Sequence, residues 1–182
     1  MKKFELTTEF ITNFLGTKLF RIKALVEFGK VEKGELGGFV EKEENLDHDG
    51  DAWVYGDARV YGDARVSGDA WVSGNARVYG NAEVSGDARV YGDAEVSGNA
   101  EVSGDQMYAT VKGFGSEYRN TTFFITKDGN VCVNCGCFSG TLEQFREKVE
   151  ETHKDTKYAK EYLTIADLME MHFKEELEKI KK

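Results

Sequence analysis

The central part of the chain repeats one pattern of apolar and polar positions every six residues. Nine consecutive hexads read Gly-[Asp/Asn]-Ala-x-Val-[Tyr/Ser] from Gly50 to Ser103, with no insertion or deletion. In each hexad Ala and Val alternate with a variable and a polar residue, the period-2 pattern of a short strand with one apolar face. The Gly-Asp or Gly-Asn pair between strands favours a corner, because these residues tolerate positive φ at low cost. The tract therefore predicts short strands separated by corners.

A coil suits these strands better than a series of hairpins, because four-residue hairpin strands would bury little area. If three hexads close one triangular coil, each Val stacks on the Val eighteen residues later. Each strand then pairs with the strands about 4.8 Å above and below it. We therefore predict a mainly β fold with a parallel β-helix over residues 50–110.

Stacking every third hexad predicts three outward faces, made of the variable positions and the Tyr or Ser positions. The first face carries Trp53, Trp71 and Arg89, flanked by Tyr55, Ser73 and Tyr91. The second face carries Arg59, Arg77 and Glu95, flanked by Tyr61, Tyr79 and Ser97. The third face carries Arg65, Glu83 and Glu101, flanked by Ser67, Ser85 and Ser103.

The segment before the repeats, residues 1–49, is expected to be an N-terminal strand segment and a cap. Residues 18–28 are rich in strand-forming residues and predict one long strand. Residues 31–46 keep a decayed hexad, with Val40 and Leu46 six positions apart, and about two residues are inserted around His48. We interpret this stretch as an imperfect first coil, since repeat arrays need atypical ends to cover their core and strand edges.

Beyond Gly104 the six-residue period ends, and residues 111–182 predict a small α+β module. A hairpin is expected over residues 120–135 with its turn at Asp128-Gly129. The pattern Thr141-x-x-Gln144 is a capping box that starts a helix to about His153. A second helix from about Thr156 completes a ββαα arrangement. Its apolar stripe from Tyr158 to Ile180 is either a trimeric coiled-coil seam or a cover for the hairpin, and we favour the cover.

The hexads resemble the hexapeptide-repeat left-handed β-helix family, in which a branched aliphatic residue points inward and a small residue lies two positions before it. This resemblance implies left-handed coiling and a homotrimer with flat faces packed around a threefold axis. The flanking motifs Leu19–Leu25, Gly34–Val40, Glu44–Leu46 and Cys135–Phe145 look like those of repeat proteins common in phages and prophages. They imply a viral or prophage setting and no assigned reaction.

Charge and composition narrow the choice of partners. The formal net charge is −9 and the pI is near 5.0, which argues against a general nucleic-acid or anionic-membrane binder. No apolar run reaches membrane-spanning length and no signal core follows Met1. Three clustered cysteines suggest a reduced compartment. We expect a cytoplasmic protein, in the host cytosol if phage-encoded, without a cofactor.

Two patterns resemble catalytic or metal sites, and each has a simpler explanation. His48 is the one general-base candidate in the helix region for an acyltransferase, but a lone loop histidine is more often solvated surface. Cys132, Cys135 and Cys137 form C-x-x-C-x-C without the second pair that tetrahedral zinc usually requires. In an extended strand Cys135 and Cys137 would share a face with the neighbouring valines. We favour buried cysteines acting as small hydrophobes.

The outward faces carry the best functional signal. Exposed tryptophan is costly unless something covers it, so we expect the Trp and Tyr faces to be subunit interfaces of a homotrimer. A sharper hypothesis is that clefts between these faces bind a ligand, with guanidinium forks for a phosphate and rings for a base. The predicted ligand-binding residues are Arg59, Arg77, Arg89, Tyr61, Tyr79, Trp53 and Trp71.

We therefore predict a non-enzymatic binding protein of phage type. It would sequester a small nucleotide-like signal, or a host protein, to antagonise a bacterial defence. One alternative is a rigid trimeric scaffold or virion-associated protein, and another is a hexapeptide-repeat acyltransferase that uses His48.

Overall fold

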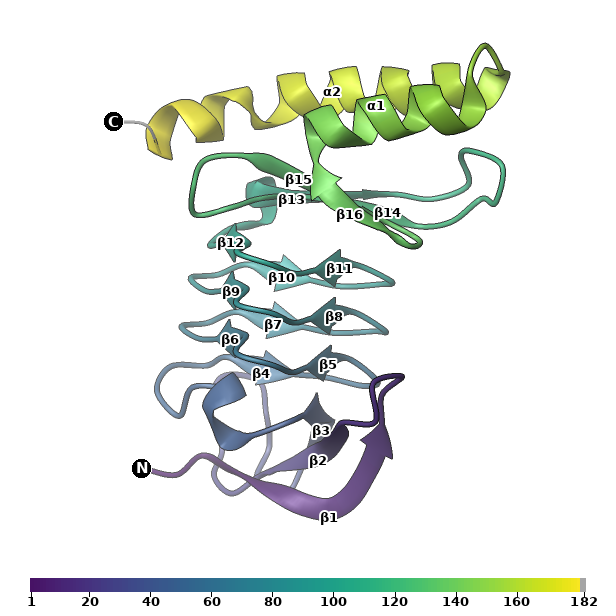
Figure 1. The fold of residues 1–182 in the computed structure, drawn as a ribbon. Helices are drawn as coiled ribbons and strands as arrows, with labels where there is room; N and C mark the ends of the chain where they lie inside the picture. The colour runs from purple at the N-terminus through teal and green to yellow at the C-terminus, as the bar shows by residue number, and fades with distance from the viewer. Residues whose placement is uncertain (181–182) are drawn as a thin grey trace. The chain divides into compact units, whose positions relative to one another are not determined.

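The computed structural model describes residues 1–180, and the chain forms two compact units, Met1–Asp105 and Gln106–Lys182 (Figure 1). The repeat tract and the segment before it belong to the same unit. That unit is a parallel β-solenoid of about four coils. The second unit is a sheet with two helices.

Each hexad of the repeat contributes one two-residue strand. These strands are β4 (Trp53–Val54), β5 (Arg59–Val60), β6 (Arg65–Val66), β7 (Trp71–Val72), β8 (Arg77–Val78), β9 (Glu83–Val84), β10 (Arg89–Val90), β11 (Glu95–Val96) and β12 (Glu101–Val102). Each pairs in parallel with the strand eighteen residues away, as in Val60 with Val78. The predicted stacking of every third hexad is confirmed, whereas the hand of the coil stays a prediction.

Apolar side chains fill the interior of the solenoid. Every Ala and Val of the hexads is buried, and Val78 is a representative example. Burying such a side chain contributes about 1.5–3 kcal/mol relative to leaving it in water. The backbone connects successive coils, since the N–H of Arg59 donates to the carbonyl of Ala76 (2.9 Å) and that of Tyr61 to Val78 (3.0 Å). Core packing and backbone hydrogen bonds together hold each coil against the next.

The first coil is imperfect, as predicted from the decayed hexad. Strand β3 (Leu36–Val40) pairs in parallel with β5, so that Val40 lies beside Val60. Leu46 forms an isolated parallel bridge with Val66. Val40 and Leu46, six residues apart, therefore occupy the same two core columns as Val60 and Val66 of the regular repeat.

An antiparallel hairpin extends one sheet of the solenoid at the N-terminal end. Strands β1 (Phe4–Thr12) and β2 (Lys18–Ala24) give the sheet order β1-β2-β3-β5-β8-β11. The expected single strand over residues 18–28 is wrong, because β2 ends at Ala24. The chain then turns, held by the Leu25 N–H to the Lys3 carbonyl (2.8 Å).

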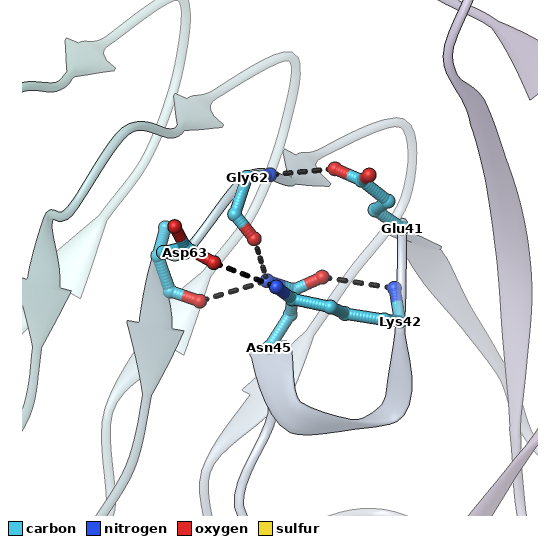
Figure 2. Close-up of polar contacts among 6 residues, drawn as sticks. Glu41, Lys42, Asn45, Gly62 and Asp63 are labelled. Atoms are coloured by element: carbon cyan, nitrogen blue, oxygen red, sulfur yellow. Dashed lines mark hydrogen bonds and ion pairs between the residues drawn. The ribbon is translucent and has the colours of Figure 1, made fainter.

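A short loop fastens the first coil to the corner that follows Tyr61 (Figure 2). It contains the 3-10 turn η1 (Glu43–Asn45). The buried Asn45 amide donates to the carbonyls of Gly62 (3.1 Å) and Ala64 (2.8 Å). Its side-chain oxygen accepts from the Lys42 N–H (2.9 Å). The Glu41 carboxylate accepts from the Gly62 N–H (2.7 Å), so the backbone of this corner is held from two sides.

The second unit contains a four-stranded antiparallel sheet and two helices. Its elements are η2 (Asp105–Met107, which begins at the unit boundary), β13 (Tyr108–Val111), β14 (Thr121–Ile125), β15 (Val131–Cys135), β16 (Phe138–Thr141), α1 (Leu142–His153) and α2 (Lys157–Ile180). The predicted hairpin and both predicted helices are confirmed. The ββαα arrangement is incomplete, because β13 and β16 add a strand on each side of the hairpin.

The apolar stripe of α2 packs inside this unit. Tyr162, Ile165, Met169 and Phe173 are buried, and the Tyr162 ring meets the Phe145 ring of α1 edge to face at 5.6 Å. Helix α2 also contacts strand β14 of the hairpin. The interpretation of this stripe as a cover for the hairpin is therefore confirmed.

Candidate functional site

The structure places the seven predicted ligand residues on two different sheets. Arg59 and Arg77 lie on strands β5 and β8 of one sheet, and Tyr61 and Tyr79 directly follow these strands; this surface is called here the second face. Trp53, Trp71 and Arg89 form a column on the sheet β10-β7-β4, called here the first face. The predicted columns are confirmed, and the structure divides the predicted residues into two separate groups.

On the first face, Trp53 does not have the exposure that was expected. Its side chain is 0% exposed, because the N-terminal segment covers the first coil. The rings of Phe4 and Phe28 meet the indole edge to face, with centroids 6.3 and 5.4 Å away. Trp53 is therefore a core residue of its own chain, and its assignment to a ligand or subunit surface is wrong.

Trp71 is the half-buried tryptophan of the first face. Tyr55 stacks on it with ring centroids 4.9 Å apart, and Lys30 Nζ lies 5.8 Å from the centroid of the indole. Arg89 is its neighbour on the next coil, and Tyr91 beyond it is 63% exposed. This part of the first face therefore combines partly accessible aromatic rings with two cationic side chains.

On the second face, two arginines and one glutamate follow one another on successive coils. Arg59 lies in register with Arg77, and Arg77 with Glu95. Arg77 Nη1 is 3.9 Å from Glu95 Oε1, a long and weak ion pair. Within residues 1–180, the half-buried Arg59 side chain forms no hydrogen bond or ion pair with another side chain or with the backbone. Backbones of adjacent coils are about 4.8 Å apart, so this column holds two arginines beside one glutamate, and that glutamate pairs with Arg77.

The tyrosines beside these arginines are tightly packed. Tyr61 and Tyr79 stack with centroids 5.1 Å apart, and Tyr61 is only 7% exposed because it packs with Leu19 and Phe39. The Tyr79 hydroxyl donates to Glu95 Oε1 (3.0 Å) and is hydrogen-bonded to Ser97. Burial, as the main cause, raises the pKa of Tyr79 to about 12. The expected stacking wall exists, but its two rings stack on each other.

Sequence reasoning missed the part of this face that the first coil and the hairpin supply. Phe39 pairs in register with Arg59 and is buried, while Arg21 pairs with Phe39. The Arg21 guanidinium carbon lies 4.3 Å from the Phe39 ring centroid, and its nitrogens bond Glu9 (2.8 Å) and the Gly37 carbonyl (2.7 Å). Phe39 could have been found by counting back one coil plus the two inserted residues from Arg59. Arg21 gives no such signal, because an antiparallel hairpin brings it there.

His48 is packed against its own chain and is not a solvated loop histidine, so that expectation is wrong. Its ring stacks on Phe4 with centroids 4.5 Å apart, and the side chain is 29% exposed. Nδ1 accepts from the Lys3 N–H (3.2 Å), and Nε2 lies 2.8 Å from Glu43 Oε1. The neutral ring therefore carries its proton on Nε2. Hydrogen bonds from Lys2, as the largest cause, and from His48 lower the pKa of Glu43.

In this arrangement the one lone pair of the neutral His48 ring, on Nδ1, already accepts the Lys3 N–H. The histidine lines an open groove of about 600 Å³ together with Arg65, Ser67 and Glu83. A general base must reach the proton that it abstracts, yet both ring nitrogens already have partners from the chain. The geometry fits a structural role, in which His48 holds the N-terminal strand against the first coil.

The three cysteines are not all buried, contrary to the expectation for small hydrophobes. Cys132 and Cys135 are partly buried, and Cys137 is exposed. Gly136 has a φ of +60° and begins the turn between β15 and β16, so Cys137 does not continue the strand face of Cys135. The interpretation as buried hydrophobes is thus wrong for Cys137. Over the described range, no group of three or more His, Cys, Asp or Glu side chains is placed to hold a metal ion.

The repeat tract is similar to one known family. A family model described as the YdcK beta solenoid repeat matches three stretches, residues 52–68, 58–74 and 70–83. All three lie within the coils described above, so the match agrees with the solenoid fold. No curated protein sequence matches the chain. Among the helices up to residue 180, none has the length and apolar character needed to cross a membrane.

Proposed function

We propose that this protein is a non-catalytic binding protein, and that its second face binds an anionic partner. The observation that carries the proposal is the Arg59–Arg77 pair. Two guanidinium groups occupy adjacent coils, and the single carboxylate beyond them pairs with Arg77. Like charges on adjacent coils repel one another, and a nearby anion reduces that repulsion. A phosphate or carboxylate bound at Arg59 would relieve that repulsion.

The bound anion is the phosphate of a small nucleotide-like signal, or an acidic group on a host protein. The protein acts in the host cytosol as a phage or prophage product that antagonises a bacterial defence. Support for this setting comes from the resemblance of the flanking motifs to phage repeat proteins, and support for anion binding comes from Arg59.

A homotrimer belongs to the same proposal. The half-buried Trp71 and the exposed Tyr91 on the first face support it, because aromatic residues are enriched in subunit interfaces. Trp71→Glu would place a charge in that contact and is expected to yield monomers in light scattering. A monomeric wild type at tens of micromolar would remove the trimer from the proposal.

The engagement of His48 supports the non-enzymatic reading over an acyltransferase. If His48 holds the N-terminal strand in place, His48→Ala should lower the free energy of unfolding. Neither the wild type nor this variant should then transfer an acyl group. Acyl transfer from acetyl-CoA that disappears in His48→Ala would replace our proposal with the enzymatic one.

Binding is tested by calorimetry and thermal shift against a panel of cyclic and linear nucleotides at low and high salt. The wild type should bind a phosphorylated member with an affinity that falls as salt rises. Arg59→Ala combined with Arg77→Ala should weaken binding while leaving the assembly unchanged. Arg65→Ala is the matched control, because Arg65 occupies the equivalent position on the third face. Without binding to any member, a rigid scaffold is the better description of the protein.

A further inference from the structure

The aromatic side chains of the second face are already engaged within the chain. One ring face of Tyr61 is covered by Tyr79, and the side chain packs with Leu19 and Phe39. Tyr79 lies between Tyr61 and the buried Ser97 on successive coils. Its hydroxyl is hydrogen-bonded to both Glu95 and Ser97. A flat heterocycle would therefore find no uncovered ring on Tyr61, and Tyr79 has no spare hydroxyl proton.

The Tyr79 hydroxyl also determines which of the two arginines pairs with Glu95. By holding the Glu95 carboxylate at 3.0 Å, the Tyr79 hydroxyl keeps that carboxylate beside Arg77, on the side away from Arg59. The other neighbour of Arg59 in the column is Phe39, whose ring carries no hydrogen-bond acceptor. Arg59 thus lies between a ring and a second cation. The half-buried Arg59 side chain offers its donors no acceptor within the described residues.

We propose that the second face recognises the phosphoryl group of its ligand through the Arg59 guanidinium and does not read a base. A guanidinium presents parallel N–H donors that match two phosphoryl oxygens. Arg77 adds electrostatic attraction, part of which Glu95 offsets. This inference rests on the proposed anion binding and specifies its ligand class, a phosphoryl group whatever it is attached to.

The experiment compares three probes by calorimetry on the full chain: AMP, ribose 5-phosphate and adenosine. AMP and ribose 5-phosphate carry the same phosphate monoester on the same sugar and differ in the base. The two phosphates should bind within about threefold of each other, and adenosine should not bind. Arg59→Ala should weaken both phosphates by roughly tenfold to a hundredfold, the loss typical of a hydrogen-bonded charged group.

Matched variants separate charge from geometry. Arg59→Lys keeps the charge without the planar fork and should fall between the wild type and Arg59→Ala. Arg77→Ala should weaken binding by less than Arg59→Ala does, because Glu95 already offsets part of its charge. Tryptophan fluorescence checks that each variant remains folded, since both tryptophans lie in the solenoid unit.

The outcomes distinguish this inference from the proposed function. If AMP binds more than about tenfold tighter than ribose 5-phosphate, or if adenosine binds, the base is read and the inference is wrong while anion binding stands. If Arg77→Ala loses more than Arg59→Ala, the assignment of the phosphoryl contact is also wrong. If neither phosphate binds, anion binding itself fails and the inference fails with it.

Discussion

Tyr61 and Tyr79 lie one coil apart, and their rings stack with centroids 5.1 Å apart and planes only 4° from parallel. This geometry follows from a strictly parallel, in-register ladder, which places equal residues directly above one another. The stack links two coils and positions the hydroxyl that donates to Glu95.

Tyr79→Phe is expected to keep the ring stack and to remove the hydrogen bonds of the hydroxyl to the Glu95 carboxylate and to Ser97. The free energy of unfolding of the solenoid unit should fall by roughly 1–3 kcal/mol. Urea titration followed by tryptophan fluorescence measures this. Tyr91→Phe is the control, because that side chain is mostly in solvent, and a loss as large as that of Tyr79→Phe would contradict the assignment.

The stability of the solenoid should fall as pH rises from about 10 to 12. The pKa of Tyr79 is raised to about 12, so the folded protein binds more protons than the unfolded chain over this window. Stability decreases with pH wherever the folded state holds the extra protons. Unfolding titrations at pH 9, 10.5 and 11.5 test this, with Tyr79→Phe expected to flatten the slope. An unchanged slope in that variant would exclude Tyr79 as the source.

Two glycines at equivalent corners allow a matched test of coil packing. Gly80 and Gly98 have φ values of +73° and +65°, so alanine is strained at both. A Cβ at Gly80 would lie 2.9 Å from the Gly98 nitrogen, whereas a Cβ at Gly98 meets nothing within 4 Å. Gly80→Ala should therefore destabilise the protein more than Gly98→Ala, by at least about 1 kcal/mol. Equal melting temperatures would show that the coils can separate without cost.

Burial of Trp53 can be measured directly. In Trp71→Phe the single remaining tryptophan should emit at short wavelength and resist quenching by iodide, because Phe4 and Phe28 cover it. In Trp53→Phe the remaining Trp71 should be quenched more readily. If Trp53 is the more accessible of the two, the N-terminal segment does not cover the first coil in solution.

The second unit offers a test of the predicted capping box. Thr141 Oγ1 accepts from the Gln144 N–H (3.2 Å), and Gln144 Oε1 accepts from the Thr141 N–H (2.9 Å). Thr141→Ala should lower the stability of this unit by about 1 kcal/mol, whereas Thr141→Ser should retain most of it. Far-ultraviolet circular dichroism during thermal unfolding reports the helices. Equal melting of both variants would contradict a capping role.

Much of the solenoid could be predicted because its repeat leaves few alternatives. The strict hexad gives the strand positions, the buried columns and the outward order of Arg59, Arg77 and Glu95. These depend on local turn chemistry and on alternation along each strand, which are both visible in one sequence. The decayed first coil was recognisable for the same reason, since Val40 and Leu46 keep the core spacing.

The rest depends on contacts between segments that share no period. Strand β1 and the cover over Trp53 arise because the hairpin folds back on the first coil, and no spacing predicts that return. The hydrogen bonds of His48 likewise join residues far apart in the sequence. On the second face, the sequence predicted which residues lie in the column. It did not predict the hydrogen bond by which the Tyr79 hydroxyl keeps Glu95 beside Arg77.

The eighteen-residue coil described above also determines which insertions and deletions this surface can tolerate. Gain or loss of three hexads would lengthen or shorten the rod by one strand spacing, about 4.8 Å, and return every later residue to its original side. Gain or loss of one hexad would preserve the buried Ala and Val pattern equally well. If the change lies between Arg59 and Arg77, however, it would rotate every later side chain to the next side and move Arg77 away from Arg59. The buried core therefore tolerates length changes in multiples of six residues, whereas a binding surface that spans several coils tolerates them only in multiples of eighteen.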